Sequence, residues 1–241
     1  MKEEQKEETF TPLERWIPKT SIGKAVKKGE LTDLNIILNK GEKILENEII
    51  DTLLPNLSTD LLEVGQSKGK FGGGKKSIWR QTQKKTKEGN KIRFSACAIV
   101  GNQDGFVGLG RGSSRETMPA RDKATRQAKL QIIKVRRGCG SWKCGCGEPH
   151  SIPFKVSGSV GSVTINLMPA PKGTGLVIEK ECAKILKFAG IKDIHTKAYG
   201  NKRTKINLVY ACFDALKELS KVKMPNDYNK KAGVLSGNEQ H

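Results

Sequence analysis

The pattern of apolar and polar positions predicts short helices near the N-terminus and mixed strands and helices after them. Ranges 20–30 and 41–54 place apolar residues near a 3.6-residue period, which predicts two helices. Pro55 follows the second range and ends it, because proline cannot continue a helix. The range 1–10 is charged and the range 225–241 is polar, and both are expected to be disordered.

The first mixed unit combines two strand patterns with one helix. Runs of β-branched and apolar residues at 93–100 and 105–110 predict strands that are joined by a turn. The range 117–135 predicts a helix, with Thr117 as its cap and Pro119 tolerated in its first turn. Small residues recur every four positions on one face of this helix, at Ala120, Ala124, Ala128 and then Ile132. That face is expected to pack on a sheet.

A second mixed unit begins near residue 151. Strand patterns lie at 152–160, 162–170 and 192–200, and helical patterns lie at 179–190 and 205–220. His195 falls on a strand face. Because both units combine a sheet with helices, the fold class is predicted to be α+β.

Charge narrows the function more than hydrophobicity does. The 241 residues carry a formal net charge of +19 and a pI near 9.7. We therefore expect a polyanionic partner, with nucleic acid as the first candidate and an anionic membrane surface as the second. No apolar run reaches the ~20 residues of a membrane-spanning helix. The N-terminus, MKEEQKEETF, lacks the apolar segment of a secretory signal, so we expect a reducing, cytoplasmic compartment.

Lysines and arginines gather in and beside glycine-containing turns. The range 81–94 carries a run of them around Gly89. Such a run is commonly a solvated surface, but the net charge favours contact with an RNA backbone. Aromatic residues make up only 5% of the chain, so phosphate and shape recognition fit better than base stacking. The candidate RNA contacts are Lys75, Lys76, Lys84, Lys85, Lys87, Lys91, Arg93, Arg111, Arg115, Arg121 and Lys172.

Three glycine-containing stretches could contact anions, and two of them are similar to nucleotide-binding loops without completing one. In 69–77, GKFGGGKKS, Lys76 stands where a P-loop needs Ser or Thr, so a flexible basic loop is expected. In 105–114, GFVGLGRGSS, the pattern breaks at Ser113, and we expect a turn that brings the backbone close to a phosphate. In 169–181, two readings stay open: a tight strand-to-helix connection, or an anion at a helix N-terminus.

The stretch CGSWKCGCGEPH crowds metal-binding side chains into one loop. Cys139, Cys144, Cys146 and His150 have the spacing C-x4-C-x-C-x3-H. Three thiolates and one imidazole form a closed tetrahedral set for structural Zn²⁺. A catalytic zinc would need a general base, and Glu148 is the only acid nearby in the sequence.

Other interpretations of the cysteines stay open. Free thiols are the main alternative to zinc, and a disulfide is a minor one in a reducing compartment. The tight spacing of Cys144 and Cys146 could also leave one of them unbound. The other three cysteines, Cys97, Cys182 and Cys212, fall in predicted elements and are expected to be core residues.

Two long motifs resemble a known family. RFSACAIVGNQDGFVGLGRGSSRETMPARDKA, at 93–124, resembles the glycine-rich signature of the universal small-subunit ribosomal protein number five. PAPKGTGL, at 169–176, followed by AGIKDIHTKAYGN, at 189–201, resembles that family's C-terminal domain. The resemblance covers about 64–220. The N-terminal extension and the Cys/His loop are similar to the archaeal type, whose eukaryotic counterpart is small-subunit protein two.

The resemblance implies a fold, a role and a location. The fold would be a double-stranded-RNA-binding-like domain of sheet and helix, followed by a left-handed βαβ domain. The role would be structural and non-enzymatic, in the cytoplasmic ribosome, supporting subunit assembly and decoding accuracy. The partners would be small-subunit rRNA, the universal protein number four and mRNA near the side where it enters. The turn from Lys84 to Arg93 would enter rRNA, and Gly105 to Thr117 would adjoin protein four.

The expected organisation therefore has five parts. They are a partly helical extension at 1–63, the RNA-binding-like domain at 64–138, a zinc loop at 139–150, the βαβ domain at 151–221 and a flexible tail at 222–241. We expect a bound zinc ion to cross-link this loop and to fix it between the two domains, because neither domain obviously buries the loop. For the function of the protein, the alternatives to a ribosomal role are a free-standing RNA-binding regulator and an enzyme that uses the kinase-like second domain.

Overall fold

The computed structural model describes residues 16–67, 69 and 74–237. The chain divides between Pro55 and Asn56 into two compact units, which are described separately. The expected disorder of 1–10 and the centre of the glycine-rich stretch 69–77 lie outside the described residues. Strands and helices combine in the second unit as an α+β fold, which confirms the predicted class.

The N-terminal unit contains three short helices, α1 Ser21–Lys27, α2 Leu34–Asn39 and α3 Asn47–Leu53. Helix α1 confirms the helix that was predicted at 20–30. The helix that was predicted over 41–54 is wrong in its first half, because only α3 forms there. The sequence analysis did not identify α2. Apolar side chains from all three helices are buried, so each helix contributes to the core of this unit.

The side chain of Glu46 connects the start of α3 to the segment before α1. Its carboxylate accepts hydrogen bonds from the backbone N–H groups of Lys19 (2.9 Å) and Thr20 (2.7 Å) and from the indole N–H of Trp16 (2.8 Å). Burial acts to raise the pKa of Glu46, but these donors together lower it below its usual range. Glu46 itself has an extended backbone and is the residue immediately before α3.

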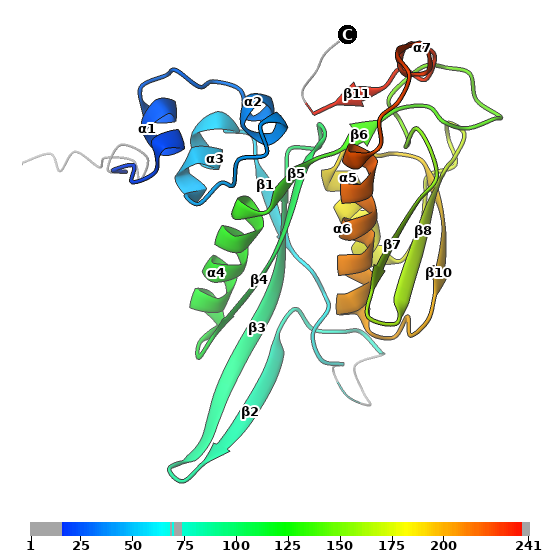
Figure 1. Ribbon diagram of the computed structural model, residues 1–241. Coiled ribbons are helices and arrows are strands. Elements are labelled where there is room, and N and C mark those ends of the chain that lie inside the picture. The colour runs from blue at the N-terminus through cyan, green and yellow to red at the C-terminus, as the bar shows by residue number, and fades with distance from the viewer. Residues whose placement is uncertain (1–15, 68, 70–73, 238–241) are drawn as a thin grey trace, which may run out of the picture. The chain divides into compact units, whose positions relative to one another are not determined.

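The first sheet of the second unit has the strand order β1–β3–β4–β5, with β2 paired to the outer part of β3 (Figure 1). Its strands are β1 Ser58–Leu61, β2 Arg80–Thr86, β3 Gly89–Gly101, β4 Phe106–Ser114 and β5 Ile132–Lys134. All of its pairs are antiparallel. Residues 89–93 of β3 pair with β2 alone, so the β2–β3 hairpin extends beyond the end of β4.

Helix α4, Thr117–Leu130, packs on β3 and β4 (Figure 1). Its buried face consists of Ala120, Ala124 and Ala128, as the four-residue repeat predicts. The predicted end at residue 135 is wrong, because the β-branched residues after the helix leave it and pair with β4 as strand β5. The cap position is also corrected, since Glu116 precedes the helix and Thr117 is its first residue.

The second sheet has the order β7–β8–β10–β9. Its strands are β7 Val156–Val160, β8 Val163–Pro169, β9 Leu176–Val177 and β10 Ile194–Tyr199. Strands β9 and β10 run parallel, with α5 Lys180–Phe188 between them in the chain, which makes the βαβ unit. Helix α6, Lys205–Lys221, packs on β7 and β8 (Figure 1). Of these elements, only β9 was not predicted.

One apolar core connects the two sheets of this unit. It combines Ile99 and Leu109 from the first sheet with Leu186 from α5 and Leu216 from α6. The predicted core cysteines Cys97, Cys182 and Cys212 are all buried within it. The regions on the two sides of the Cys/His loop are therefore held together by apolar packing that does not involve the loop.

The segment that follows α6 is ordered up to residue 237, so the predicted disorder of 225–241 is wrong over that part. It forms α7, Asn226–Lys231, and β11, Leu235–Ser236, which pairs with β6, Arg136–Arg137. The hydroxyl of Tyr228 donates to the carbonyl of Pro153 at 2.5 Å. Polar composition predicted a flexible tail, but backbone pairing does not require apolar side chains.

Candidate functional site

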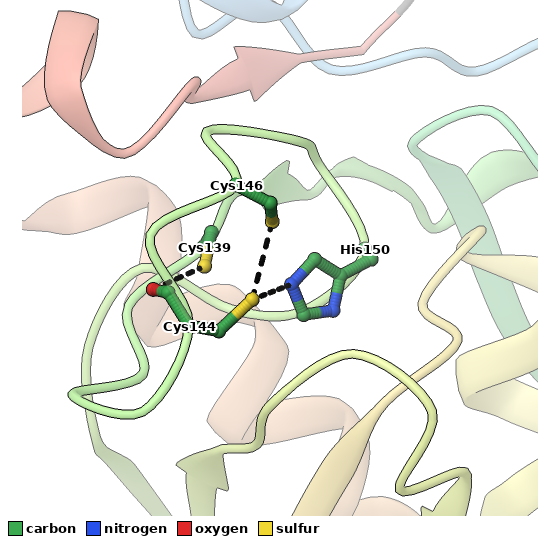
Figure 2. A group of neighbouring side chains, drawn as sticks. All are labelled: Cys139, Cys144, Cys146 and His150. Carbon is green, nitrogen blue, oxygen red and sulfur yellow. Dashed lines mark hydrogen bonds between the residues drawn. The ribbon is translucent and has the colours of Figure 1, made fainter.

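The predicted metal ligands meet in the connector between the two sheets. Cys139, Cys144, Cys146 and His150 converge from the 139–150 loop (Figure 2). Their ligand atoms all lie within 4.8 Å of one another. The Sγ of Cys144 lies 3.3 Å from the Sγ of Cys146 and 3.8 Å from the Nε2 of His150. The structure thus brings together all four residues that the sequence singled out.

These distances fit one four-coordinate ion. Zn–S bonds of about 2.3 Å in a tetrahedron place ligand sulfurs about 3.8 Å apart and a ring nitrogen slightly closer. A disulfide would instead need an S–S distance of about 2.05 Å, and all six cysteines have free thiols. The cluster can therefore hold a metal ion, and its three sulfurs and one imidazole favour a soft or borderline one.

The surroundings of the thiols favour deprotonation at one position. Hydrogen bonds from the backbone N–H groups of Lys172 and Cys146 lower the pKa of Cys144 to about 6. The N–H of Glu148 acts in the same direction on Cys146, but desolvation and the neighbouring thiols raise the pKa of Cys146 to about 11. The opposite shifts arise because the two thiols lie close together, and a cation would relieve the repulsion between their thiolates.

Both ends of the loop are buried and anchored. Cys139 is 8% exposed and His150 is 4% exposed, whereas Trp142 in the middle of the loop is fully exposed. The N–H of Cys139 donates to the carbonyl of Ala232 at 2.8 Å, so the C-terminal segment holds one end. The expectation that neither domain buries the connector is therefore wrong at its two ends, because backbone pairing holds them against neighbouring segments.

A basic groove of about 730 Å³ lies where the β2–β3 hairpin, the end of β4 and the start of α4 meet. Five cations line it: Lys84, Lys91, Arg93, Arg115 and Lys123. Four of these were predicted as RNA contacts. The sequence analysis did not select Lys123, which lies in the second turn of α4 and could have been found from its four-residue helical spacing to Pro119.

Two features of this groove favour an anionic ligand. Lys84 lies directly opposite Lys91 across the hairpin, and directly opposed like charges destabilise a strand pair. Lys91 pairs with Glu88 at 3.0 Å, whereas Lys84 forms no ion pair within the part of the chain that the structure describes. In addition, the 14-residue helix α4 begins at the groove without a side-chain cap and without an acidic residue in its first turn. Its free N–H groups attract negative charge.

The other predicted RNA contacts do not line this groove. Arg121 lines a separate hollow beside Asp60. Lys76 donates to the carbonyl of Arg203 at 2.9 Å, and burial together with the charge of Lys205 lowers its pKa. Lys172 pairs with Glu148 at 2.6 Å beside the Cys/His loop. The remaining candidates are exposed elsewhere on the second unit, at Lys75, Lys85, Lys87 and Arg111.

The glycines of 105–114 form a strand, and the expected turn around a phosphate is wrong. Gly108, Gly110 and Gly112 lie in β4 directly beneath α4. A Cβ atom on Gly110 would lie 2.1 Å from the backbone nitrogen of Ala128. These glycines allow the helix and the sheet to approach closely, which is a packing role.

The alternatives for 169–181 can now be compared. The carboxylate of Glu179 accepts hydrogen bonds from the N–H groups of Glu181 (2.9 Å) and Cys182 (3.4 Å) at the start of α5. The chain's own carboxylate thus occupies the position that an anion would take. Gly173 and Gly175 both have positive φ angles in the preceding turn, which favours the tight connection.

Family comparisons cover most of the first and second sheets of the second unit. Residues 78–136 match the family described as Ribosomal protein S5, N-terminal domain. Residues 158–231 match the family described as Ribosomal protein S5, C-terminal domain. The two matches lie on either side of the Cys/His loop. Within the described part of the chain, no helix is long and apolar enough to span a bilayer.

Curated relatives match nearly the whole chain. The small ribosomal subunit protein uS5 of Nanoarchaeum equitans is 49% identical over 93% of this chain and 96% of its own length. The protein of the same name from Methanocaldococcus jannaschii is 44% identical, over 93% and 97%. That of Methanococcus maripaludis strain DSM 14266 is 43% identical, over 98% and 99%. The chain therefore belongs to the ribosomal protein S5 family and is similar to its archaeal members.

Proposed function

We propose that the protein is a structural, non-enzymatic constituent of the small ribosomal subunit that binds rRNA. Family membership supports the ribosomal role and a cytoplasmic location on the ribosome. The basic groove is the observation that carries the RNA contact, because it combines five cations with an uncapped helix N-terminus. Such a site binds phosphate oxygens and reads RNA shape more than base sequence.

Sucrose-gradient sedimentation of cell lysate tests the ribosomal role. The protein should sediment with small subunits, whereas a free-standing RNA-binding regulator would stay in the soluble fractions. Replacing the groove residues of the hairpin, Lys84, Lys91 and Arg93, by alanine should weaken binding to small-subunit rRNA. A matched variant that loses three exposed lysines elsewhere, Lys155, Lys197 and Lys223, should bind more tightly than the groove variant. Equal loss in the two variants would remove the groove from the interface.

We propose Zn²⁺ as the ion of the Cys/His cluster. Cys139, Cys144, Cys146 and His150 would hold it, and the ion would supply structural cross-linking of the connector and no catalysis. Elemental analysis of purified protein should find one zinc per chain, and Cys144→Ser should lose it. Ser141→Ala in the same loop is the control, since Ser141 is not part of the cluster. Absence of zinc from wild-type protein would reject the site.

We also propose contacts with the universal protein number four, and with mRNA near the side where it enters, for the segment around Arg115 and Arg121. The support is the family resemblance of 93–124 and the exposure of both arginines. Losing these contacts should raise near-cognate misincorporation on fully assembled ribosomes more than it slows peptide-bond formation. If assembled Arg115→Ala and Arg121→Ala ribosomes show normal misincorporation, the segment serves subunit assembly and has no role in decoding accuracy. Gly110 is unsuitable for this test, because its packing role would confound it.

A further inference from the structure

His150 has a second buried partner on the side of its ring that faces away from the cysteines. The Nδ1 of His150 lies 2.9 Å from the Oδ2 of Asp193, and the two side chains are 4% and 6% exposed. The other ring nitrogen, Nε2, points toward the Sγ of Cys144 at 3.8 Å (Figure 2). The imidazole is thus placed between a carboxylate and the sulfur cluster.

Asp193 is itself held in place by the backbone. Its Oδ1 accepts a hydrogen bond from the N–H of Gly175 at 2.8 Å. Its own N–H donates to the carbonyl of His150 at 3.1 Å, and the N–H of Lys192 donates to the same carbonyl at 2.9 Å. The residue lies one position before β10. Both carboxylate oxygens therefore have donors, and the position of the side chain is fixed before any metal binds.

This arrangement determines which ring nitrogen is available to a metal. A carboxylate accepts a hydrogen from Nδ1, so Nδ1 carries the N–H and Nε2 keeps its lone pair. That lone pair faces three thiols whose sulfurs lie within 4.8 Å of it and of one another. An imidazole in a metal centre commonly donates its other N–H to a carboxylate in this way.

We propose that Asp193 is the positioning residue of the metal centre, which orients His150 for binding through Nε2. The inference rests on the proposed Zn²⁺ site and deepens it. It also gives the centre a connection beyond its own loop, because Asp193 lies immediately before β10 of the second sheet, 43 positions along the chain from His150. The ion, through His150 and Asp193, links the connector to the start of β10.

The test compares two carboxylates near the same cluster. Asp193→Asn removes the charge of the buried partner of His150, and Asp193→Ala removes the partner itself. Glu148→Gln removes one negative charge from an exposed residue between Cys146 and His150, whose carboxylate pairs with Lys172 rather than with a ligand. Zn²⁺ affinity is measured by competition with a chromophoric chelator on full-length protein, with circular dichroism to verify folding. Co²⁺ substitution, followed by its thiolate charge-transfer absorption, reports whether three sulfurs still bind.

We expect the Asp193 variants to bind Zn²⁺ about 10–100-fold more weakly than wild type, with the three-sulfur signal retained. Glu148→Gln should stay within about fivefold of wild type, since an exposed charge contributes little. Equal affinities for the Asp193 variants and Glu148→Gln would overturn the role of Asp193 while leaving the metal centre intact. A wild-type protein that binds no Zn²⁺ would instead reject the proposed metal site itself.

Nitrogen NMR of zinc-loaded wild-type protein gives a readout that does not depend on any variant folding. Histidine labelled with ¹⁵N should show His150 bound through Nε2, with a proton retained on Nδ1. Metal bound through Nδ1 would overturn the proposal, because the hydrogen bond to Asp193 could not then exist. The labels on His195, which is exposed on β10, provide the unbound reference.

Discussion

Gly110→Ala should separate helix α4 from the sheet beneath it. The strand carries glycine at every second position on the face that meets the helix, at Gly108, Gly110 and Gly112. The facing helix carries alanine at 120, 124 and 128, all fully buried. Backbone therefore packs almost directly on backbone, and one added methyl group has no space to occupy.

The magnitude follows from the distances. A Cβ on Gly110 would lie 2.1 Å from the nitrogen of Ala128 and 2.4 Å from the carbonyl oxygen of Ala124. Comfortable separations of such atoms are about 3.5 Å, so the helix would have to retreat by roughly 1.4 Å. A gap of about 1 Å already forfeits up to half of each dispersion contact along the interface. Because backbone atoms cannot rotate away, we expect Gly110→Ala to lower the free energy of unfolding by about 3 kcal/mol, the upper end of the range for overpacked cores.

Urea unfolding followed by circular dichroism measures this loss. Arg126→Ala, on the exposed face of the same helix, is the control and should change the free energy of unfolding by no more than about 0.5 kcal/mol. Amide hydrogen exchange should show the loss concentrated in α4. If Gly110→Ala also lowers the free energy of unfolding by less than about 0.5 kcal/mol, the close approach of helix and strand does not stabilise this domain.

Three further perturbations test other parts of the chain. Replacing Lys84, Lys91 and Arg93 by alanine should make the plot of log affinity for rRNA against log salt concentration less steep, by about 2 to 3 units of slope. Filter binding measures this slope, and an unchanged slope would exclude phosphate contacts of these three residues. Truncation after Met224 should accelerate hydrogen exchange at the Cys139 amide, which donates to the carbonyl of Ala232, while exchange at β8 amides stays unchanged. Slow exchange at Cys139 in the truncated protein would mean that the C-terminal segment does not hold the loop. The pKa of Glu46 is lower in the folded protein than in the unfolded protein, where it is about 4.3. Ionised Glu46 therefore adds to the free energy of unfolding above a pH of about 4.3, and this contribution is lost as the pH falls through the pKa of the folded protein. Glu46→Gln should therefore flatten the acid limb of the unfolding curve, monitored through Trp16 fluorescence, and an unchanged acid limb would contradict this account.

Periodicity predicted the elements whose side chains divide cleanly between core and solvent. The alanine repeat of α4 and the apolar runs of β3 and β8 are examples. Strand β2, with QKK at its centre, was missed because it has no buried residue and therefore shows no apolar pattern, although its backbone pairs with β3. The glycines of β4 were misread for a related reason. Glycine in a sequence indicates freedom of the backbone, and here it indicates a close neighbour instead.

The candidate site divides along similar lines. The four metal ligands are close in sequence, so their spacing alone predicted that they meet. Asp193 was not found, because its link to His150 spans 43 positions and an aspartate before a strand has no local signature. The groove was predicted in part, since its hairpin cations form a run, whereas Lys123 joins them only through the packing of α4 on the sheet.

The proposed metal centre would act on the connector more than on the arrangement of the first and second sheets. Apolar residues from both sheets already share one core, to which the Cys/His loop contributes no ligand residue. Glu181, fully buried at the start of α5, also accepts the N–H of Glu63 at 2.8 Å and fixes the same junction by a polar contact. What the core leaves unsupported is the glycine-rich loop between Cys139 and His150, whose middle is exposed. An ion bound by the four side chains would fix that loop, and through Asp193 and Ala232 it would also join the start of β10 and the C-terminal segment. The proposed zinc ion would thus be a local reinforcement of a junction that apolar packing has already formed.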